Sequence, residues 1–311
     1  MINKLIANIE KGFTGKRKII EKVIAAMLAG GHILIDDVPG VGKTTLAKSL
    51  SASINCGFTR IQFTPDTLPS DVVGMTIYNM ATGKFETVQG AIMNNIIMAD
   101  EINRTSPKTQ ASLLEAMEEK QVTIDGTKYE LPELFMVIAT ENPVEYAGTY
   151  VLPEAELDRF MIRLSLGYPD KETEIKLIMN NLDGMAADDI QAVLNENDVI
   201  SMKQQVSKVT LKPSIIEYIT NIVRETRESE DIILGASPRA AIALAKMSQA
   251  MAFINGRDYV IPDDVLYIVT DVLAHRMIYA PLIAAGKDAE INYVKKLIKK
   301  IPVPNGMNGR G

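Results

Sequence analysis

The sequence predicts an α/β fold in which a five-stranded parallel sheet with helices on both faces precedes a small all-α domain. Three observations lead to this prediction. The apolar segment Ile33–Asp36 runs through a glycine-rich turn into a helical stretch. Apolar runs at 95–101 and 134–139 end in acidic or polar residues, as buried parallel strands do at a ligand-binding edge. From residue 171 onward, the apolar residues recur with helical spacing.

Composition limits the classes of protein that this chain can be. Its 311 residues suggest about two domains of ~150 residues each, and no apolar run approaches the ~18 residues of a membrane span. The N-terminal segment lacks the apolar stretch of a signal peptide. Cys56 is the only cysteine, which excludes a disulfide framework and fits a cytoplasmic location. The net charge of −6 argues against nucleic acid as a partner.

The turn after the first strand has the composition of a phosphate-binding P-loop. Glycines let successive N–H groups point at phosphate oxygens, and the following helix adds the partial positive charge of its N-terminus. Lysine in this loop can contact the β- and γ-phosphates, and the next hydroxyl can bind Mg²⁺. The candidate binding residues are Pro39, Gly40, Val41, Gly42, Lys43, Thr44 and Thr45. The full pattern GxxxxGK[ST] has glycine where this chain has Asp37, so the backbone conformation at this position stays open.

The remaining elements of the first domain follow from apolar spacing and from turn residues. A hairpin is predicted near 76–88 around Ala81–Gly83, and a second one at 121–131 around Asp125-Gly126. Such long insertions are commonly functional, although a solvated surface decoration is the alternative. The other predicted helices are 1–11, 16–29, 44–54, 107–120 and a short one from 153, and the other predicted strands are 59–63 and 161–166.

Polar side chains follow two of the predicted buried strands. Asp100 and Glu101 end the run from Asn95, and Asn142 follows the strand at 134–139. If the first of these strands lies beside the P-loop strand, Asp100 can hold Mg²⁺ through the ion's water shell, and Glu101 can accept a proton from an attacking water or polarise it. Asn142 can orient that water or contact the γ-phosphate. Two acids that only cap the next helix, and an asparagine that only forms a turn before Pro143, are the alternatives.

The boundary of the first domain is predicted at 167–170. Residues 1–168 then form the nucleotide-binding domain, 169–280 a helical domain, 281–301 a further helix and 302–311 a flexible tail. Arg239 lies in the first turn of a helix, where the helix dipole disfavours cations, so it is a candidate anion contact or an ordinary surface arginine. The helices predicted in this region are 171–182, 187–194, 198–206, 213–228, 238–255 and 262–278.

Together these residues resemble an AAA+ ATPase, and more closely the MoxR family. The resemblance covers most of residues 13–255, in the order of the family. Its strings are DVPGVGKT at 37–44, ADEINR at 99–104, PKTQASLLEAMEEKQVT at 107–123, ATENPVEYAGTYVLPEAELDRF at 139–160 and SPRA at 237–240.

The resemblance implies a role for each matching residue. Lys43 and Thr44 would bind phosphate and Mg²⁺, and Asp100 and Glu101 would be the Walker-B acids. Asn142 would be sensor 1. Arg159 would be the arginine finger that reaches the neighbouring subunit's site, with Arg163 as the alternative, and Arg239 would be sensor 2 in the helical lid. The hairpins at 76–88 and 121–131 would be the helix-2 and pre-sensor-1 insertions of this clade.

The resemblance also implies a function. The protein would hydrolyse ATP with Mg²⁺ as a homo-oligomeric ring, usually a hexamer. It would act as a chaperone-like remodeller in the assembly, activation or metal-cofactor insertion of partner complexes, among them von Willebrand factor A domain proteins. A nucleic-acid motor or loader, a protein unfoldase and a non-enzymatic nucleotide-gated scaffold are the alternatives. The acidic charge argues against the first of these, and the intact P-loop and acids argue against the last.

Overall fold

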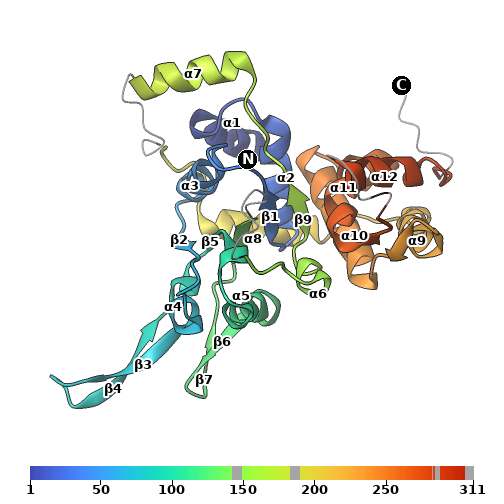
Figure 1. The fold of residues 1–311 in the computed structure, drawn as a ribbon. Coiled ribbons are helices and arrows are strands. Elements are labelled where there is room, and N and C mark those ends of the chain that lie inside the picture. The colour runs from blue at the N-terminus through green and yellow to red at the C-terminus, as the bar shows by residue number, and fades with distance from the viewer. Residues whose placement is uncertain (142–148, 183–189, 282, 284–287, 305–311) are drawn as a thin grey trace. The chain divides into compact units, whose positions relative to one another are not determined.

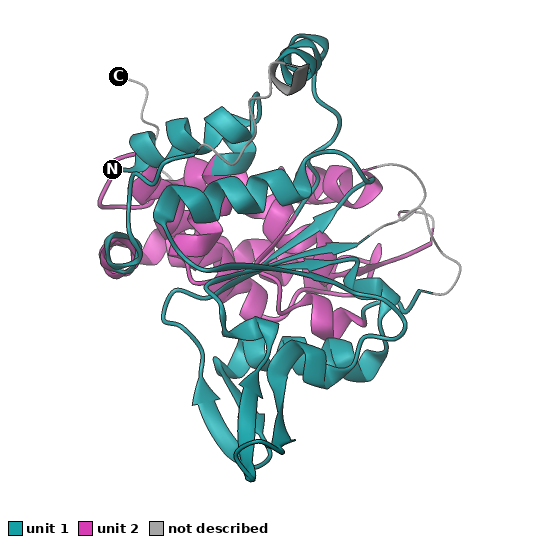
Figure 2. Ribbon diagram, turned by 90° about the vertical axis from the view of Figure 1, so that its left-hand side faces the viewer, with its two compact units in different colours: residues 1–20, 32–152, 164–200 teal, residues 21–31, 153–163, 201–311 magenta. Residues whose placement is uncertain are grey.

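The computed structural model describes residues 1–141, 149–182, 190–281, 283 and 288–304. The chain forms two compact units, each made of separate stretches: 1–20, 32–152 and 164–200 in the first unit, and 21–31, 153–163 and 201–311 in the second (Figure 2). The predicted domain boundary near residue 168 stays a prediction, because the compact units do not follow the order of the chain. Within the described ranges, no helix is long and apolar enough to cross a membrane.

The predicted five-stranded parallel sheet is confirmed, in the order β2-β5-β8-β1-β9. β5 pairs in parallel with β2 and β8, and β8 pairs in parallel with β1. Residues 96–99 of β5 and 137–139 of β8 have no exposed surface, as expected for central strands covered on both faces. The strands are β1 (Ile33–Asp36), β2 (Phe58–Gln62), β5 (Ile96–Asp100), β8 (Met136–Glu141) and β9 (Ile162–Leu164).

In the first unit, α5 (Pro107–Glu119) begins with a side-chain cap. In α5, Ser106 Oγ accepts a hydrogen bond from the Thr109 N–H, and Pro107 occupies the first turn. α1 packs against α3 (Figure 1). The helices of this unit are α1 (Ile2–Gly12), α3 (Lys43–Ile54), α4 (Pro69–Val73), α5 (Pro107–Glu119) and α7 (Lys171–Leu182), with 3₁₀ turns at Ala91–Met93 and Ile102–Arg104. Two helices, α2 (Arg17–Leu28) and α8 (Glu196–Val206), have residues in both units.

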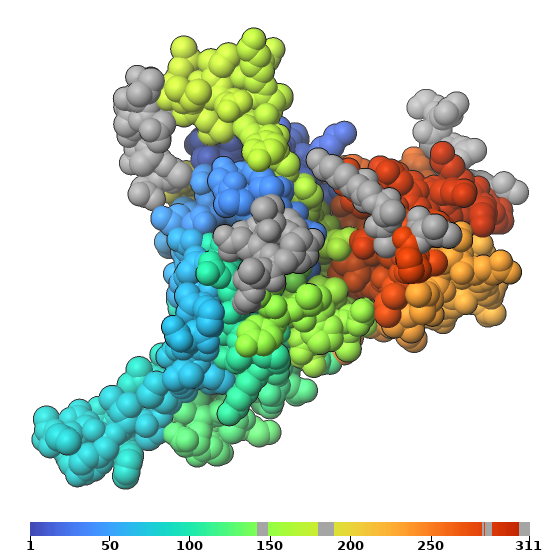
Figure 3. Space-filling model, in the orientation of Figure 1, coloured from blue at the N-terminus to red at the C-terminus, as the bar shows by residue number. Residues whose placement is uncertain are grey.

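Both predicted hairpins are present in the first unit. β3 (Gly74–Asn79) pairs with β4 (Lys84–Gln89), and β6 (Gln121–Ile124) pairs with β7 (Thr127–Glu130). The turn between β6 and β7 has positive φ at both Asp125 and Gly126, as a type I′ turn requires. The two hairpins lie side by side (Figure 1). A hydrogen bond joins them, in which Tyr129 Oη of β7 donates to Thr87 Oγ1 of β4 at 3.1 Å. Figure 3 shows β3 and β4 projecting as an arm.

The second unit is helical, but it also contains a short antiparallel pair of strands. One predicted helix, 262–278, ends at Leu273, because Ile278 and Tyr279 pair with the strand at 232–234. Prolines occupy the first turns of α9, α10 and α11, as predicted. The elements are α6 (Glu154–Leu157), α9 (Pro213–Glu228), β10 (Ile232–Leu234), α10 (Pro238–Ile254), α11 (Pro262–Leu273), a 3₁₀ turn at Ala274–Arg276, β11 (Ile278–Tyr279) and α12 (Ala289–Ile298).

The prediction of a helix at 187–194 is wrong for its described part. Residues 190–195 have no helical structure. The N–H groups of Val193 and Leu194 donate to the carbonyl oxygen of Ser53, at 3.0 and 3.2 Å. A contact with a residue distant in the sequence therefore holds this segment in a non-helical conformation. In the predicted tail, residues 302–304 have no helix or strand, and 305–311 lie outside the described residues.

Candidate active site

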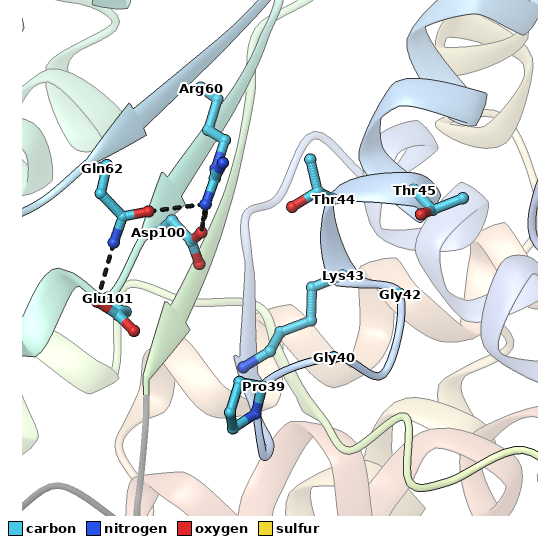
Figure 4. Close-up of a pocket in the computed structure, with 10 residues that line it drawn as sticks. All are labelled: Pro39, Gly40, Gly42, Lys43, Thr44, Thr45, Arg60, Gln62, Asp100 and Glu101. Atoms are coloured by element: carbon cyan, nitrogen blue, oxygen red, sulfur yellow. Dashed lines mark hydrogen bonds and ion pairs between the residues drawn. The ribbon is translucent and has the colours of Figure 1, made fainter. Parts of the chain in front are cut away.

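A cavity of about 370 Å³ lies between the P-loop and the carboxyl-terminal ends of β2 and β5, all in the first unit (Figure 4). This edge of a parallel sheet is the usual ligand-binding edge of α/β folds. The cavity is lined by Pro39, Gly40, Gly42, Lys43, Thr44, Thr45, Arg60, Gln62, Asp100 and Glu101. The structure therefore brings together the residues predicted from two separate stretches of the sequence.

The P-loop side of the cavity is made largely of backbone. Gly40 and Gly42 have φ of 85° and 92°, which residues with a Cβ atom rarely adopt. Gly42 is also the N-cap of α3, so the N–H groups of the first turn of that helix lie next to the loop. Val41 does not line this cavity and is almost fully buried. The loop thus has the form that an anion requires.

Lys43 carries the positive charge of the loop. Its Nζ donates to the carbonyl oxygen of Asp37 at 2.5 Å. Burial lowers the pKa of Lys43, and the nearby carboxylates, led by Asp100, act in the opposite direction. A half-buried ammonium that forms no salt bridge with a carboxylate of the described residues is well placed to receive an anionic phosphate.

Asp37 has a structural role that differs from that of the glycine in the P-loop pattern. It is not among the residues with positive φ, so its backbone does not need glycine. Its nearly buried carboxylate accepts hydrogen bonds from the N–H groups of Val38 and Gly167 and from Ser165 Oγ, at 2.9, 2.6 and 3.1 Å. The side chain therefore ties the P-loop to the segment that follows β9. This answers the question that the sequence left open about residue 37.

Asp100 lies at the end of β5, where residues of two neighbouring strands hold its carboxylate. Oδ1 accepts a hydrogen bond from Thr140 Oγ1 on β8 at 2.6 Å. Oδ2 accepts two from the Arg60 guanidinium on β2, at 2.5 and 3.1 Å. Asp100 shares the cavity with Thr44, and both supply the oxygen ligands that Mg²⁺ prefers. The donor set therefore fits a magnesium ion.

Glu101 follows Asp100 with a left-handed backbone, at a φ of 57°. Its N–H donates to the same Thr140 Oγ1 at 2.9 Å, which fixes the turn. Its Oε2 accepts hydrogen bonds from Gln62 Nε2 at 2.9 Å and from Arg104 at 3.0 Å. Gln62 lies opposite Asp100 in the pairing of β2 with β5, so this contact follows from the register. Glu101 is thus held at the edge of the cavity by Gln62 and Thr140 from neighbouring strands and by Arg104 from the turn that follows it.

A second cavity, of about 200 Å³, adjoins the other side of the P-loop. It is lined by Gly12, Phe13, Thr14, Lys16, Gly40, Val41, Gly42, Thr45, Pro169 and Leu177. Its walls combine an aromatic ring and aliphatic side chains with a few polar groups, as in sites for planar organic rings. Sequence reasoning predicted the P-loop residues of this cavity but missed the other six, because no motif joins a loop near residue 13 to a proline at 169.

The residues described as lining the cavity do not include Arg159, Arg163 or Arg239. Arg159 and Arg239 belong to the second unit, so their roles stay predictions, and Asn142 lies outside the described residues. Arg163 forms an ion pair with Glu290 of α12 in the same unit. The buried Arg276 donates to Asp158 Oδ1 at 2.8 Å and to the carbonyl oxygen of Phe160 at 2.5 Å. These contacts hold the Asp158 side chain and the Phe160 backbone, the residues on either side of Arg159.

Comparisons with known proteins agree with this geometry. Residues 32–162 match the ATPase family associated with various cellular activities (AAA), and residues 224–292 match the AAA lid domain. The chaperone MoxR1 of Mycobacterium tuberculosis is 32% identical over 97% of this chain and 82% of its own length. The uncharacterized protein YeaC of Bacillus subtilis is 47% identical over 98% of this chain and 95% of its own.

A solved structure shows the same fold. The crystal structure of a candidate ATPase from Cytophaga hutchinsonii superposes with a TM-score of 0.91 at 39% identity, covering 97% of this chain and 94% of that one. The chain belongs to the MoxR family of AAA+ ATPases. It is therefore an enzyme that binds and hydrolyses ATP.

Proposed function

We propose that the protein is a Mg²⁺-dependent ATPase that works as a homo-oligomeric ring, a hexamer, and remodels partner protein complexes as a chaperone. The observation that carries this proposal is the cavity shared by the P-loop, Asp100 and Glu101. Phosphoryl transfer needs cations around the phosphates and a group that orients the attacking water. This cavity offers both kinds of group on facing sides.

The two cavities suggest which part of the nucleotide each of them binds. The triphosphate fits the cavity at Gly40–Thr45, where the N–H groups and Lys43 can share its charge. The base fits the cavity lined by Phe13 and Leu177, because an aromatic ring and aliphatic carbons favour a planar heterocycle. Gly40, Gly42 and Thr45 line both cavities, so one ligand can occupy both.

The residues around the phosphates divide the chemistry among them. Thr44 and Asp100 would hold Mg²⁺, which neutralises phosphate charge when bound. Glu101 would accept the proton of the attacking water, because its carboxylate lies next to Asp100 on the same edge. Asn142, by its resemblance to sensor 1, would orient that water.

We propose a ring because Lys43 and Mg²⁺ alone would leave the charge of the transition state incompletely neutralised. An arginine finger in trans contributes about 10³–10⁵ in rate in related phosphoryl-transfer enzymes. Arg159 is the leading candidate, by its place in the family's motif, and Arg163 is the alternative. Arg239, in the first turn of α10, would be the sensor-2 contact.

The chaperone role comes from the relatives. MoxR1 carries the name chaperone, and the MoxR family is associated with von Willebrand factor A domain partners and with metal-cofactor insertion. We propose the same class of client for this protein. A cytoplasmic location, which fits the single cysteine, is also part of the proposal.

ATP turnover across a protein concentration series, with light scattering at each point, tests the proposal. Specific activity that rises as a ring assembles is expected. Flat activity from a monomer would exclude the shared interfacial site. Turnover strongly stimulated by DNA would favour the nucleic-acid motor instead.

Subunit mixing tests Arg159 directly. We expect Arg159→Ala to bind ATP but to lose most of its turnover, by about 10³-fold or more. A Lys43→Ala subunit keeps its Arg159 finger but has a defective P-loop in its own nucleotide site. Mixed rings of the two variants should regain activity that neither has alone, because a wild-type finger then faces a wild-type site. Arg224→Ala, at an exposed arginine on α9, is the control. Absence of recovery in rings shown to be mixed would remove the assignment in trans.

A further inference from the structure

Arg60 lies in the cavity, although no motif pointed to it. From β2, its Nε and one terminal nitrogen donate to Asp100 Oδ2, at 3.1 and 2.5 Å, and the same terminal nitrogen donates to Gln62 Oε1 at 2.7 Å (Figure 4). A protein cation therefore already neutralises the carboxylate that is the candidate metal ligand.

The two side chains of this ion pair differ in how firmly they are held in place. The Asp100 side chain is 14% exposed and is fixed through its other oxygen by Thr140, whereas the Arg60 side chain is 47% exposed. A pair with one exposed partner is weak, because water and salt screen it and a long side chain must be held in place. Arg60 can therefore leave Asp100 more easily than Asp100 can move.

Hydrogen bonds connect Arg60 to the second acid as well. Arg60 binds Gln62 Oε1, and Gln62 Nε2 binds Glu101 Oε2 at 2.9 Å. Asp100, Arg60, Gln62 and Glu101 thus form a continuous chain of polar contacts along the edge of the sheet. A change at Asp100 Oδ2 reaches the candidate catalytic base through these side chains.

We propose that Arg60 is a positioning residue that acts as a displaceable counter-ion. It holds Asp100 while no metal is bound, competes with Mg²⁺ for Oδ2, and turns away when Mg²⁺ arrives with the nucleotide. Its departure also frees Gln62 Oε1, so the entry of metal loosens the contacts that hold Glu101. This inference rests on the proposed magnesium-dependent function.

Metal binding measured directly tests the inference. Mn²⁺ is the probe, because its electron paramagnetic resonance signal reports free and bound ion at saturating ADP. In Arg60→Ala the competing cation is gone, so Mn²⁺ should bind about three- to tenfold tighter than in the wild type. Arg60→Lys, which keeps the charge, should stay near the wild-type value. Arg224→Ala is the control for loss of a surface arginine, and thermal unfolding checks that each variant is folded.

The outcomes separate this inference from the proposed function. Unchanged or weaker Mn²⁺ binding in folded Arg60→Ala overturns the counter-ion role. Weaker binding of metal-free ADP, measured in EDTA, would show that Arg60 contacts phosphate, which also overturns it. If the wild type itself shows no ADP-dependent Mn²⁺ binding, the magnesium-dependent function fails instead. In turnover assays, Arg60→Ala should need a lower Mg²⁺ concentration for half-maximal rate, by a similar factor.

Discussion

The two sides of the active-site cavity are built in different ways. The phosphate side comes from the contiguous segment 39–45 and is made of backbone N–H groups, two glycines with positive φ and one lysine. The acid side is made of side chains from three strands, with Asp100 and Glu101 held by Arg60, Gln62 and Thr140. One side is a local motif, and the other exists only after the sheet has formed.

The difference shows where each side is vulnerable. A loop of main-chain donors fails mainly when its conformation or its lysine is lost. In the network of side chains the effect depends on burial, because loss of the buried Thr140 hydroxyl leaves Asp100 Oδ1 and the Glu101 N–H with unmet hydrogen bonds, whereas Arg60 and Gln62 are exposed to water. Substitutions on the two sides should therefore separate binding of ATP from its hydrolysis.

We expect the largest changes from one substitution on each side of the cavity, Glu101→Gln for the rate of hydrolysis and Lys43→Ala for the affinity for ATP. Glu101→Gln keeps the shape but removes the base, so hydrolysis should fall by about 10²–10⁴-fold while ATP remains bound. Lys43→Ala should weaken ATP binding by about 10–100-fold, the equivalent of one lost charge-assisted hydrogen bond. Single-turnover hydrolysis and equilibrium binding of ATP measure the two effects. Unchanged hydrolysis in Glu101→Gln would show that another group is the base.

A smaller effect is expected from Thr140→Val, which removes one oxygen from the acid side. The hydroxyl donates to Asp100 and accepts from the Glu101 N–H, so both acids lose their support. Turnover should fall by about 10–100-fold through misplacement of the acids, and stability should fall by ~1–3 kcal/mol. Denaturant unfolding and steady-state kinetics measure these changes, with Thr140→Ser as the matched control that keeps the hydroxyl. Wild-type kinetics in Thr140→Val would mean that the two acids are held by their strand and turn alone.

The smallest effect on turnover is expected from Asp37→Gly, which restores the P-loop pattern. The structure predicts that the change is harmful, because the carboxylate receives three hydrogen bonds and the backbone needs no glycine. Stability should fall by ~1–3 kcal/mol, while turnover at saturating ATP changes by less than about tenfold. Chemical denaturation monitored by circular dichroism measures the change in the free energy of unfolding. A more stable variant would show that Asp37 is not an anchor for the segment after β9.

Local signals predicted most of the fold. The order of strands and helices, both hairpins and the P-loop follow from apolar spacing, capping residues and turns such as Asp125-Gly126, which act within a few residues. Predictions were wrong where distant contacts decide the backbone. Residues 190–195 are not helical because Val193 and Leu194 bind Ser53, and the helix from 262 stops early because Ile278 and Tyr279 pair with β10.

The class of enzyme can be read from the sequence, through the P-loop, the acids after a buried strand and the order of the family's motifs. The surroundings of those acids and the role of Asp37 become visible only in the folded chain. Arg60 and Gln62 meet Asp100 and Glu101 because β2 pairs with β5 in one register, and strand register depends on packing across the whole sheet. Such contacts leave no short-range pattern, since the partners lie about forty residues apart in the chain.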